Sequence, residues 1–206
     1  MSQSKPSIIL VTGSFCLPEF YDAVTTQVAA QGYDIHTLRL PSVGPNPGES
    51  TSHLPNPPTM YDDAAAIARE IAQRAEQGKE VIVVGHSYGG VPVAQSIEGL
   101  VKEGSGQIGG VIRLGYMTAV VPALGGSTLD VLGQVAPEKR GKVRLDENGW
   151  MWQDDLPAAG ARCFSDLPPA QGLALIKLFP AHSAASFANP LTYAGYKDVP
   201  VSYLIC

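Results

Sequence analysis

Short apolar runs alternate with longer amphipathic stretches through the first 120 residues. The runs at 7–12, 81–84 and 110–116 are almost continuously apolar, and residues 33–40 form a further strand-like segment. Continuous apolar runs of this length are typical of strands that are buried on both faces of a sheet. The pattern therefore predicts strands at these positions, with room for a helix after each.

The stretch after the first strand carries apolar residues at helical spacing. Phe20, Val24 and Val28 recur every four residues. Proline is tolerated in the first turn of a helix, and glycine is common just past its end. The pattern therefore predicts a helix that begins at Pro18 and ends at Gly32.

Two further helices are predicted in the same way. Thr59, followed three residues later by Asp62, matches a capping box at the start of a helix that Gly78 ends. The apolar positions are Ala64, Ile67, Ile71 and Ala75 in this helix, and Val93, Ala94, Ile97 and Leu100 in the one after Gly89. Strands separated by helices form βαβ units, so we expect an α/β fold with a mainly parallel sheet. The active site of such a fold lies at the carboxyl ends of the strands.

The alternation stops near residue 121 and resumes only at the end of the chain. Residues 121–192 are rich in Gly, Pro and Ala, with short helical patterns such as 169–178. We interpret this segment as a helical cap inserted into the sheet domain. Residues 199–206 then read as a fifth strand. The predicted organisation is a core over 1–120, a cap over 121–192 and a return to the core over 193–206.

Composition narrows the classes of function. The chain has 206 residues, and 14 basic against 19 acidic residues give a net charge of −5. An acidic chain without a Lys/Arg cluster is a poor candidate for nucleic acid or an anionic membrane, so we expect neither as a partner. No apolar run approaches the roughly 20 residues of a membrane helix, and no signal-peptide pattern is present. The three cysteines form no C-x-x-C and no zinc-ligand set, so we expect a reducing, cytoplasmic location and no metal site; we also expect no cofactor.

The segment with the strongest chemical signal is Gly-His-Ser-Tyr-Gly over residues 85–89, between a predicted strand and a predicted helix. In this setting G-x-S-x-G places Ser87 on a sharp turn with its hydroxyl exposed, while Gly85 and Gly89 prevent a clash between strand and helix. The alternatives are a glycine-rich turn with an incidental serine, or a phosphate-binding loop. The second alternative requires G-x-G-x-x-G after the first strand, and this sequence lacks that motif there.

The turn after the first strand is the second candidate element. Acyl transfer builds negative charge on the carbonyl oxygen, and two N–H donors aimed at that oxygen stabilise it. We expect one donor to be the backbone N–H of Tyr88 and the other that of Ser14, with Gly13 letting the chain turn inward. A plain strand-to-helix turn is the alternative for this loop.

With these motifs the chain resembles the α/β-hydrolase superfamily, especially small esterase-like members grouped with plant methylesterases, hydroxynitrile lyases and their fungal relatives. The resemblance covers the whole chain. It is carried by residues 13–15 with 18–21, by 85–89, and by the cap segments 164–168 and 180–183. One departure is Thr12, where the family's oxyanion loop usually has histidine. Because the donors in that loop are backbone groups, we expect a small effect.

The resemblance also implies an acid and a histidine after the serine in chain order. The chain stops at Cys206, so both are expected beyond it, together with the last strand and helix. Within the chain His182 is the least unfavourable alternative base. His86 is expected to pack beside the elbow, His36 to be buried or half-buried in the second strand, and His53 to border the mouth of the site.

Two functions stay open on the sequence. The first is a serine hydrolase in which Ser87 attacks an ester or thioester of a small molecule. Four apolar side chains of the cap favour an apolar substrate: Trp150, Trp152, Phe164 and Leu178. The second is a protein of the same fold without hydrolysis, either a small-molecule binder or a lyase or cyclase. The apolar last strand also favours a homodimer, unless the chain is a fragment of a longer one.

Overall fold

A computed structural model describes residues 5–54, 56–102, 104 and 108–205. Its main sheet has the strand order β2-β1-β3-β4-β8, and every pair in it is parallel. This confirms the predicted α/β fold with a parallel sheet. The strands are β1 (Ser7–Val11), β2 (Asp34–Leu38), β3 (Glu80–His86), β4 (Gly110–Met117) and β8 (Val201–Leu204).

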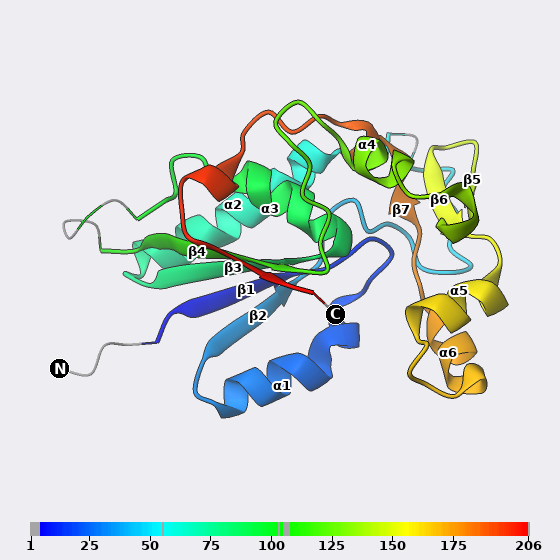
Figure 1. Ribbon diagram of the computed structural model, residues 1–206, viewed down its shortest axis with the longest axis horizontal. Coiled ribbons are helices and arrows are strands. Elements are labelled where there is room, and N and C mark those ends of the chain that lie inside the picture. The colour runs from blue at the N-terminus through cyan, green and yellow to red at the C-terminus, as the bar shows by residue number, and fades with distance from the viewer. Residues whose placement is uncertain (1–4, 55, 103, 105–107, 206) are drawn as a thin grey trace.

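Helices flank the sheet on both sides. In Figure 1, α2 (Met60–Glu76) and α3 (Gly90–Ser96) lie on one face, and α1 (Asp22–Ala30) lies on the other. The core is thickest on the α2 and α3 side, where Ile67 and Ile71 of α2 are fully buried with Val81 and Val83 of β3. In β3 every second residue is buried and the others are only half-buried. The opposite face is thus more thinly covered than the continuous apolar runs predicted.

The α1 region departs from the predicted single helix. A 3₁₀ turn over Pro18–Tyr21 precedes α1, and α1 itself has no buried residue. Val24, predicted to face the core, is 47% exposed. His36, expected to be buried or half-buried in the second strand, is exposed. Both corrections have one cause. The strand β2 lies at the edge of the sheet, and among the described helices that flank the sheet only α1 covers the face opposite α2 and α3. Side chains in this region are therefore less covered than a central strand and its helices would be.

The start of α2 confirms the capping box. The Thr59 side chain accepts a hydrogen bond from the Asp62 N–H at 3.3 Å, and the Asp62 carboxylate accepts one from the Thr59 N–H at 2.7 Å. These bonds satisfy backbone donors that the first turn leaves unpaired. The helix ends before Gly78, whose φ of +77° suits glycine. In α3 the helix ends earlier than predicted, although Ile97 still packs in the core.

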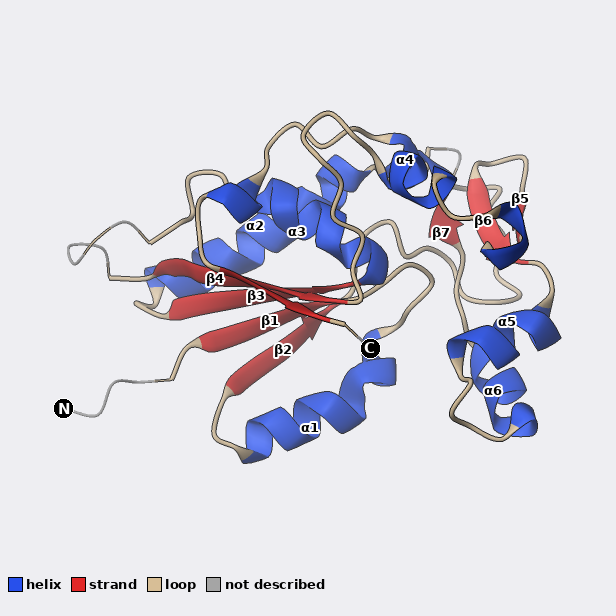
Figure 2. Ribbon diagram, viewed as in Figure 1, coloured by secondary structure: helices blue, strands red, loops and turns tan. Residues whose placement is uncertain are grey.

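The segment between β4 and β8 holds a second, smaller sheet as well as helices (Figure 2). Its antiparallel strand order is β5-β6-β7. The sequence predicted only helices here, because these strands are very short. The elements are α4 (Thr128–Gly133), β5 (Val143–Leu145), β6 (Trp150–Gln153), α5 (Leu156–Cys163), α6 (Pro169–Ile176), β7 (His182–Ser183) and α7 (Ala184–Ala188).

The proline-rich loop before α2 packs against this second sheet. The N–H of Gly44 donates to the Ala181 carbonyl at 2.9 Å, and the indole N–H of Trp150 donates to the Leu54 carbonyl at 3.1 Å. A Cβ built on Gly44 would lie 2.0 Å from the Trp150 ring, so only glycine fits there. The loop therefore ties the cap to the core.

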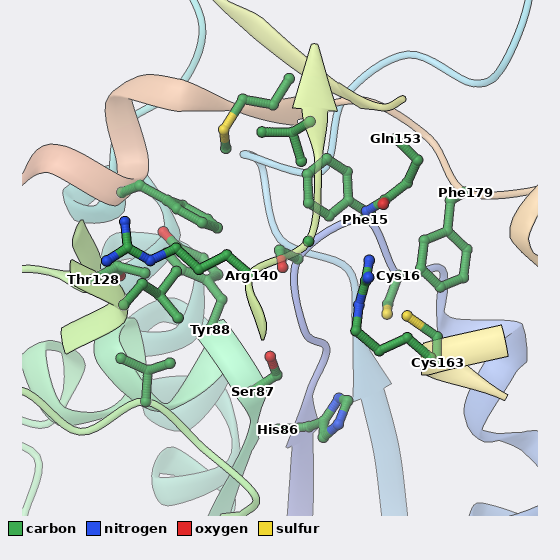
Figure 3. Close-up of a pocket in the computed structure, with 18 of the residues that line it drawn as sticks. Phe15, Cys16, His86, Ser87, Tyr88, Thr128, Arg140, Gln153, Cys163 and Phe179 are labelled. Carbon is green, nitrogen blue, oxygen red and sulfur yellow. The ribbon is translucent and has the colours of Figure 1, made fainter. Parts of the chain in front are cut away.

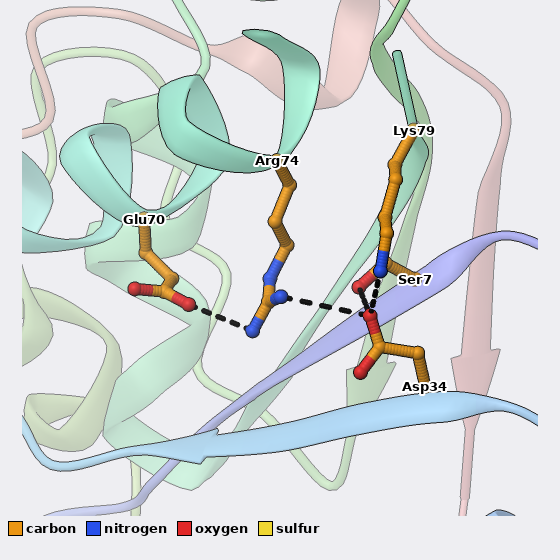
Figure 4. Close-up of polar contacts among 5 residues, drawn as sticks. All are labelled: Ser7, Asp34, Glu70, Arg74 and Lys79. Atoms are coloured by element: carbon orange, nitrogen blue, oxygen red, sulfur yellow. Dashed lines mark hydrogen bonds and ion pairs between the residues drawn. The ribbon is translucent and has the colours of Figure 1, made fainter. Parts of the chain in front are cut away.

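A cluster of charges joins three elements at the amino ends of the strands (Figure 4). The Asp34 carboxylate accepts from Lys79 Nζ at 2.6 Å and from Ser7 Oγ at 2.9 Å. Arg74 lies 3.6 Å from Asp34 and 2.7 Å from Glu70. The hydrogen bond from Lys79 is the main cause that lowers the pKa of Asp34. The cluster lies at the end of the sheet opposite the carboxyl ends, so we assign it a structural role.

The strand β8 forms the other edge of the main sheet. Val201, Tyr203 and Leu204 are 41%, 50% and 57% exposed. The Tyr203 hydroxyl donates to the Ala119 carbonyl at 2.8 Å, which fixes the strand to the loop after β4. Among the described residues, no helix is long and apolar enough to cross a bilayer.

Candidate active site

The serine of the G-x-S-x-G motif stands on a strained turn at the carboxyl end of β3. Ser87 has a φ of +51°, which few residues other than glycine adopt. A 3₁₀ turn over Ser87–Gly89 leads into α3. The Ser87 carbonyl accepts a hydrogen bond from the Val120 N–H at 2.8 Å, so the loop after β4 helps to hold the turn.

The glycines of the motif are required by close backbone contacts. A Cβ on Gly85 would lie 2.8 Å from the backbone of Gly89 and Gly90. A Cβ on Gly89 would lie 2.5 Å from the Thr12 carbonyl oxygen. The strand, the turn and the first loop therefore approach each other more closely than any side chain permits, which is the geometry of a nucleophile elbow.

The loop after β1 lies directly against the serine. A Cβ on Gly13 would come within 3.1 Å of the Ser87 Cβ, and Phe15 has a φ of +61° that turns the loop back. The Gly13 N–H donates to the Tyr21 hydroxyl at 3.0 Å, so this donor is already occupied. Ser14, Ser87 and Tyr88 all line one cavity. The structure thus brings together the residues that were predicted as nucleophile and oxyanion donors.

A tyrosine that the sequence did not single out as functional braces this loop. The Tyr21 hydroxyl lies 2.7 Å from His86 Nδ1. The Tyr21 oxygen therefore accepts from the Gly13 N–H and is also hydrogen-bonded to His86 Nδ1, so one hydroxyl connects the loop to the residue before the serine. Burial lowers the pKa of His86, which favours the neutral ring. The sequence pointed to Tyr21 only through the segment Pro-Glu-Phe-Tyr over residues 18–21. That segment contributed to the family resemblance, but no role was predicted for its tyrosine.

The side chain of Tyr88 is fixed on the far side of the elbow. Its hydroxyl donates to Asp63 of α2 at 2.6 Å, and the Ser42 N–H donates to the same carboxylate at 2.8 Å. Burial raises the pKa of Asp63 to about 6. The Tyr88 ring stacks on Phe187 with 5.2 Å between ring centroids. The backbone N–H of Tyr88 is therefore held by a side chain that is anchored at both its ring and its hydroxyl.

His182, the alternative base, is fully buried behind this tyrosine. Its ring lies 4.8 Å from the Tyr88 ring, and its Nε2 lies 3.1 Å from Ser186 Oγ. Burial lowers the pKa of His182 to about 3. Because Ser186 gives its proton to the Ser183 carbonyl at 2.8 Å, His182 Nε2 is the donor to Ser186. The geometry does not bring His182 to Ser87 and favours a role in the core.

The cavity in front of Ser87 has a volume of about 800 Å³, which suits a small organic ligand. Figure 3 shows Ser87, His86 and Tyr88 among the side chains that surround it. Of the four apolar cap residues that favoured an apolar substrate, only Phe164 lines the cavity. The other three are outside its wall: Trp150 is buried elsewhere, Leu178 is 53% exposed, and Trp152 is not a lining residue. The apolar part of the wall includes Phe15, Phe20, Val120, Leu129, Leu132, Val143, Met151, Phe164, Phe179 and Phe187.

Other reactive groups near the serine are limited. Of the four histidines only His86 lines the cavity, while His53, expected at its mouth, is exposed and not part of the wall. Cys16 also lines it, but burial raises the pKa of its thiol to about 11, so it is not a thiolate at neutral pH. Within the described residues, the Ser87 hydroxyl has no histidine or carboxylate as a hydrogen-bond partner, and no group of three His, Cys, Asp or Glu could hold a metal.

A strained serine at the end of a central parallel strand, facing a glycine loop from the first strand, defines the class of α/β hydrolases. The comparison with known proteins agrees. The chain belongs to the alpha/beta hydrolase family, which it matches over residues 8–206.

A curated relative supports this membership, and solved structures share the fold. The chain is 36% identical over 208 aligned positions to a protein of Phoma sp. named "Probable hydrolase R7", covering 98% of this chain and 77% of that one. An extracellular α/β-hydrolase from a Paenibacillus species superposes with a TM-score of 0.72 at 18% identity, covering 97% and 76% of the two chains. A pyrethroid hydrolase from Sphingobium faniae superposes with a TM-score of 0.68 at 25% identity, covering 96% and 76%.

Proposed function

We propose that this protein is a serine hydrolase that cleaves an ester or thioester of a small, largely apolar molecule. The observation that carries the proposal is the geometry of Ser87. Its φ of +51° presents the hydroxyl to a mostly apolar cavity, directly against the Gly13 loop. The pyrethroid hydrolase and the probable hydrolase that this chain resembles support the same class of reaction.

In the proposed reaction the Ser87 hydroxyl oxygen attacks the carbonyl carbon of the substrate and loses its proton to a base. The negative charge that develops on the carbonyl oxygen accepts hydrogen bonds from the Ser14 and Tyr88 backbone N–H groups, a contribution worth a few kcal/mol in comparable sites. The alcohol or thiol leaves with a proton, and water then hydrolyses the acyl-serine ester. The described residues place no base at the serine, so the proposal assigns that role to none of them.

The test is covalent labelling with a fluorophosphonate, read by intact-mass spectrometry. We expect the wild-type chain to gain one probe mass and Ser87→Ala to gain none, while Ser165→Ala, at an exposed cap serine, labels like the wild type. Removing one hydroxyl costs little packing, so Ser87→Ala should unfold at the same urea concentration as the wild type. Labelling that persists in Ser87→Ala would show that Ser87 is not the nucleophile.

A second candidate is a protein of this fold that binds a small molecule, or a lyase or cyclase, without hydrolysis. It is favoured by one observation: within the described residues, neither His182 nor His86 is hydrogen-bonded to Ser87. A wild-type chain that takes up no fluorophosphonate, yet binds small apolar esters saturably without turnover, would favour this candidate over the hydrolase.

A further inference from the structure

The charged side chains in the wall of the cavity all carry the same sign. Lys139, Arg140 and Arg162 line it, and none of its described lining residues is an aspartate or glutamate. The chain as a whole has a net charge of −5, so this basic excess is local. The three cations come from two parts of the cap: the turn after α4 and the last turn of α5.

Arg162 has no counter-ion in the described part of the chain. The ion pairs there use the cations Arg74, Lys79 and Lys102 instead. Arg162 nevertheless reaches across to the other basic segment, because a Cβ on Gly141 would lie 2.8 Å from its Nη2. The guanidinium therefore stands next to the residue that follows Arg140, with its charge uncompensated.

Arg140 is held in place without being neutralised. Its Nε donates to the Val135 carbonyl at 2.7 Å and its Nη2 donates to the Gly133 carbonyl at 2.6 Å, both near the end of α4. Its Nη1 has no partner among the described residues. Figure 3 shows Arg140 and Ser87 in the same cavity. A positioned guanidinium with a free N–H group is thus available to a ligand in that cavity.

Lys139, Arg140 and Arg162 are exposed residues of the cavity wall, so water screens part of their mutual repulsion, and an anion bound between them reduces it further. The planar guanidinium also matches the two oxygens of a carboxylate. We infer that the cavity contains an anion subsite, formed by Arg140 and Arg162 with Lys139, that takes a carboxylate group of the substrate. The inference rests on the proposed function for the ester at Ser87, and it narrows the substrate class to small apolar esters that carry a free carboxylate.

The test compares two ligands of the same shape by isothermal titration calorimetry of the full chain at low salt. Naphthalene-2-carboxylate carries the anion, and naphthalene-2-carboxamide is its neutral counterpart. Since charge-assisted hydrogen bonds are about twice as strong as neutral ones, we expect the carboxylate to bind about tenfold more tightly. In Arg162→Gln this preference should largely disappear. Lys177→Gln is the matched control, because Lys177 is an exposed cap residue outside the cavity wall.

The outcomes separate this inference from the proposed function. Equal affinity for the two ligands, or an equal loss in Lys177→Gln and Arg162→Gln, would overturn the anion subsite. So would a failure of both ligands to bind to the folded chain. Preferred carboxylate binding that depends on Arg162, in a chain that fluorophosphonate does not label at Ser87, would support the subsite and overturn the hydrolase proposal alone.

Discussion

Three residues other than glycine adopt a positive φ among the described residues, and each follows a strand of the main sheet. Phe15 follows β1, Ser87 follows β3 and Thr118 follows β4, with φ values of +61°, +51° and +44°. Such conformations cost on the order of 1–3 kcal/mol each and persist where the surroundings enforce them. All three lie at the carboxyl edge, where the site forms, so the local strain is concentrated at the proposed chemistry.

Tyr21 is the residue through which this arrangement is most easily tested. Its hydroxyl connects the Gly13 N–H to His86 Nδ1, and Tyr21→Phe leaves both groups without that partner. We expect kcat to fall roughly tenfold to a hundredfold with little change in KM, because the Gly13 loop, which carries the proposed oxyanion donor, shifts while the Tyr21 ring stays in the cavity wall. The unfolding free energy should fall by about 1–3 kcal/mol, the cost of buried polar groups without partners.

The matched control is Tyr61→Phe. The Tyr61 hydroxyl donates to the Pro190 carbonyl at 2.8 Å on the surface, away from the cavity. Steady-state kinetics and urea unfolding of both variants separate positioning from general stability. An unchanged kcat in Tyr21→Phe would show that the loop holds its position without the brace.

At the scale of elements, α2 and β7 each place a buried titratable group against Tyr88. Asp63 of α2 has its pKa raised by burial to about 6, and His182 of β7 has its pKa lowered by burial to about 3. The folded protein therefore favours neutral Asp63, whose contribution to stability is lost as pH rises from about 4 to about 6. It also favours neutral His182, whose contribution is lost as pH falls from about 6.5 towards 3. Between about pH 4 and pH 6, a rise in pH therefore lowers the unfolding free energy through Asp63 and raises it through His182.

We predict that Asp63→Asn removes the dependence of stability on pH that comes from Asp63 and leaves the one that comes from His182. Asn keeps an acceptor for the Ser42 N–H and a donor for the Tyr88 oxygen but carries no charge. The stability of Asp63→Asn relative to the wild type should rise between about pH 4 and pH 6, by up to about 1.4 kcal/mol per pH unit, and then level off.

Urea unfolding at pH 4.5, 5.5 and 6.5 measures this difference. Asp166→Asn, at an exposed cap position, serves as the control for loss of a carboxylate. A stability difference between Asp63→Asn and the wild type that stays constant over the three pH values would contradict the raised pKa.

Local patterns predicted the elements that depend on local interactions. The capping box of α2 and the elbow at Ser87 each lie within a few neighbouring residues, so their signals are complete in one segment. The second sheet was missed because its strands have only two to four residues, and because β7 pairs with β6 from about 30 residues further along the chain. The role of Tyr21 was missed for the same reason, since its partner His86 lies 65 residues away.

At the scale of the whole molecule, β8 leaves an apolar edge on the main sheet. Among the described strands it pairs only with β4, and the Leu204 side chain is 57% exposed. Unpaired N–H and C=O groups beside apolar side chains favour pairing with another chain. We therefore predict self-association through β8, with an apparent mass that rises with protein concentration.

Leu204→Lys should shift this equilibrium towards the monomer, because lysine on an edge strand opposes pairing. Light scattering after size-exclusion chromatography, over a range of concentrations, measures the mass. Leu178→Lys is the control, since Leu178 is similarly exposed, at 53%, but lies on the cap. Equal effects of the two substitutions would point to general solubility and against an edge contact.

The loop contacts around Ser87 also bear on how such a protein changes over evolutionary time. The groups that hold the serine come from 11–21, 85–90 and 118–120, all in the core, whereas the three basic residues of the cavity wall come from the cap. Substitutions at these three basic residues are expected to alter what the cavity accepts without moving the elbow, whereas Phe187 and His182, also in the cap, pack against Tyr88 and hold it. We therefore expect lineages that share this core to diversify their substrates at such cap positions, with stronger purifying selection on the core loops.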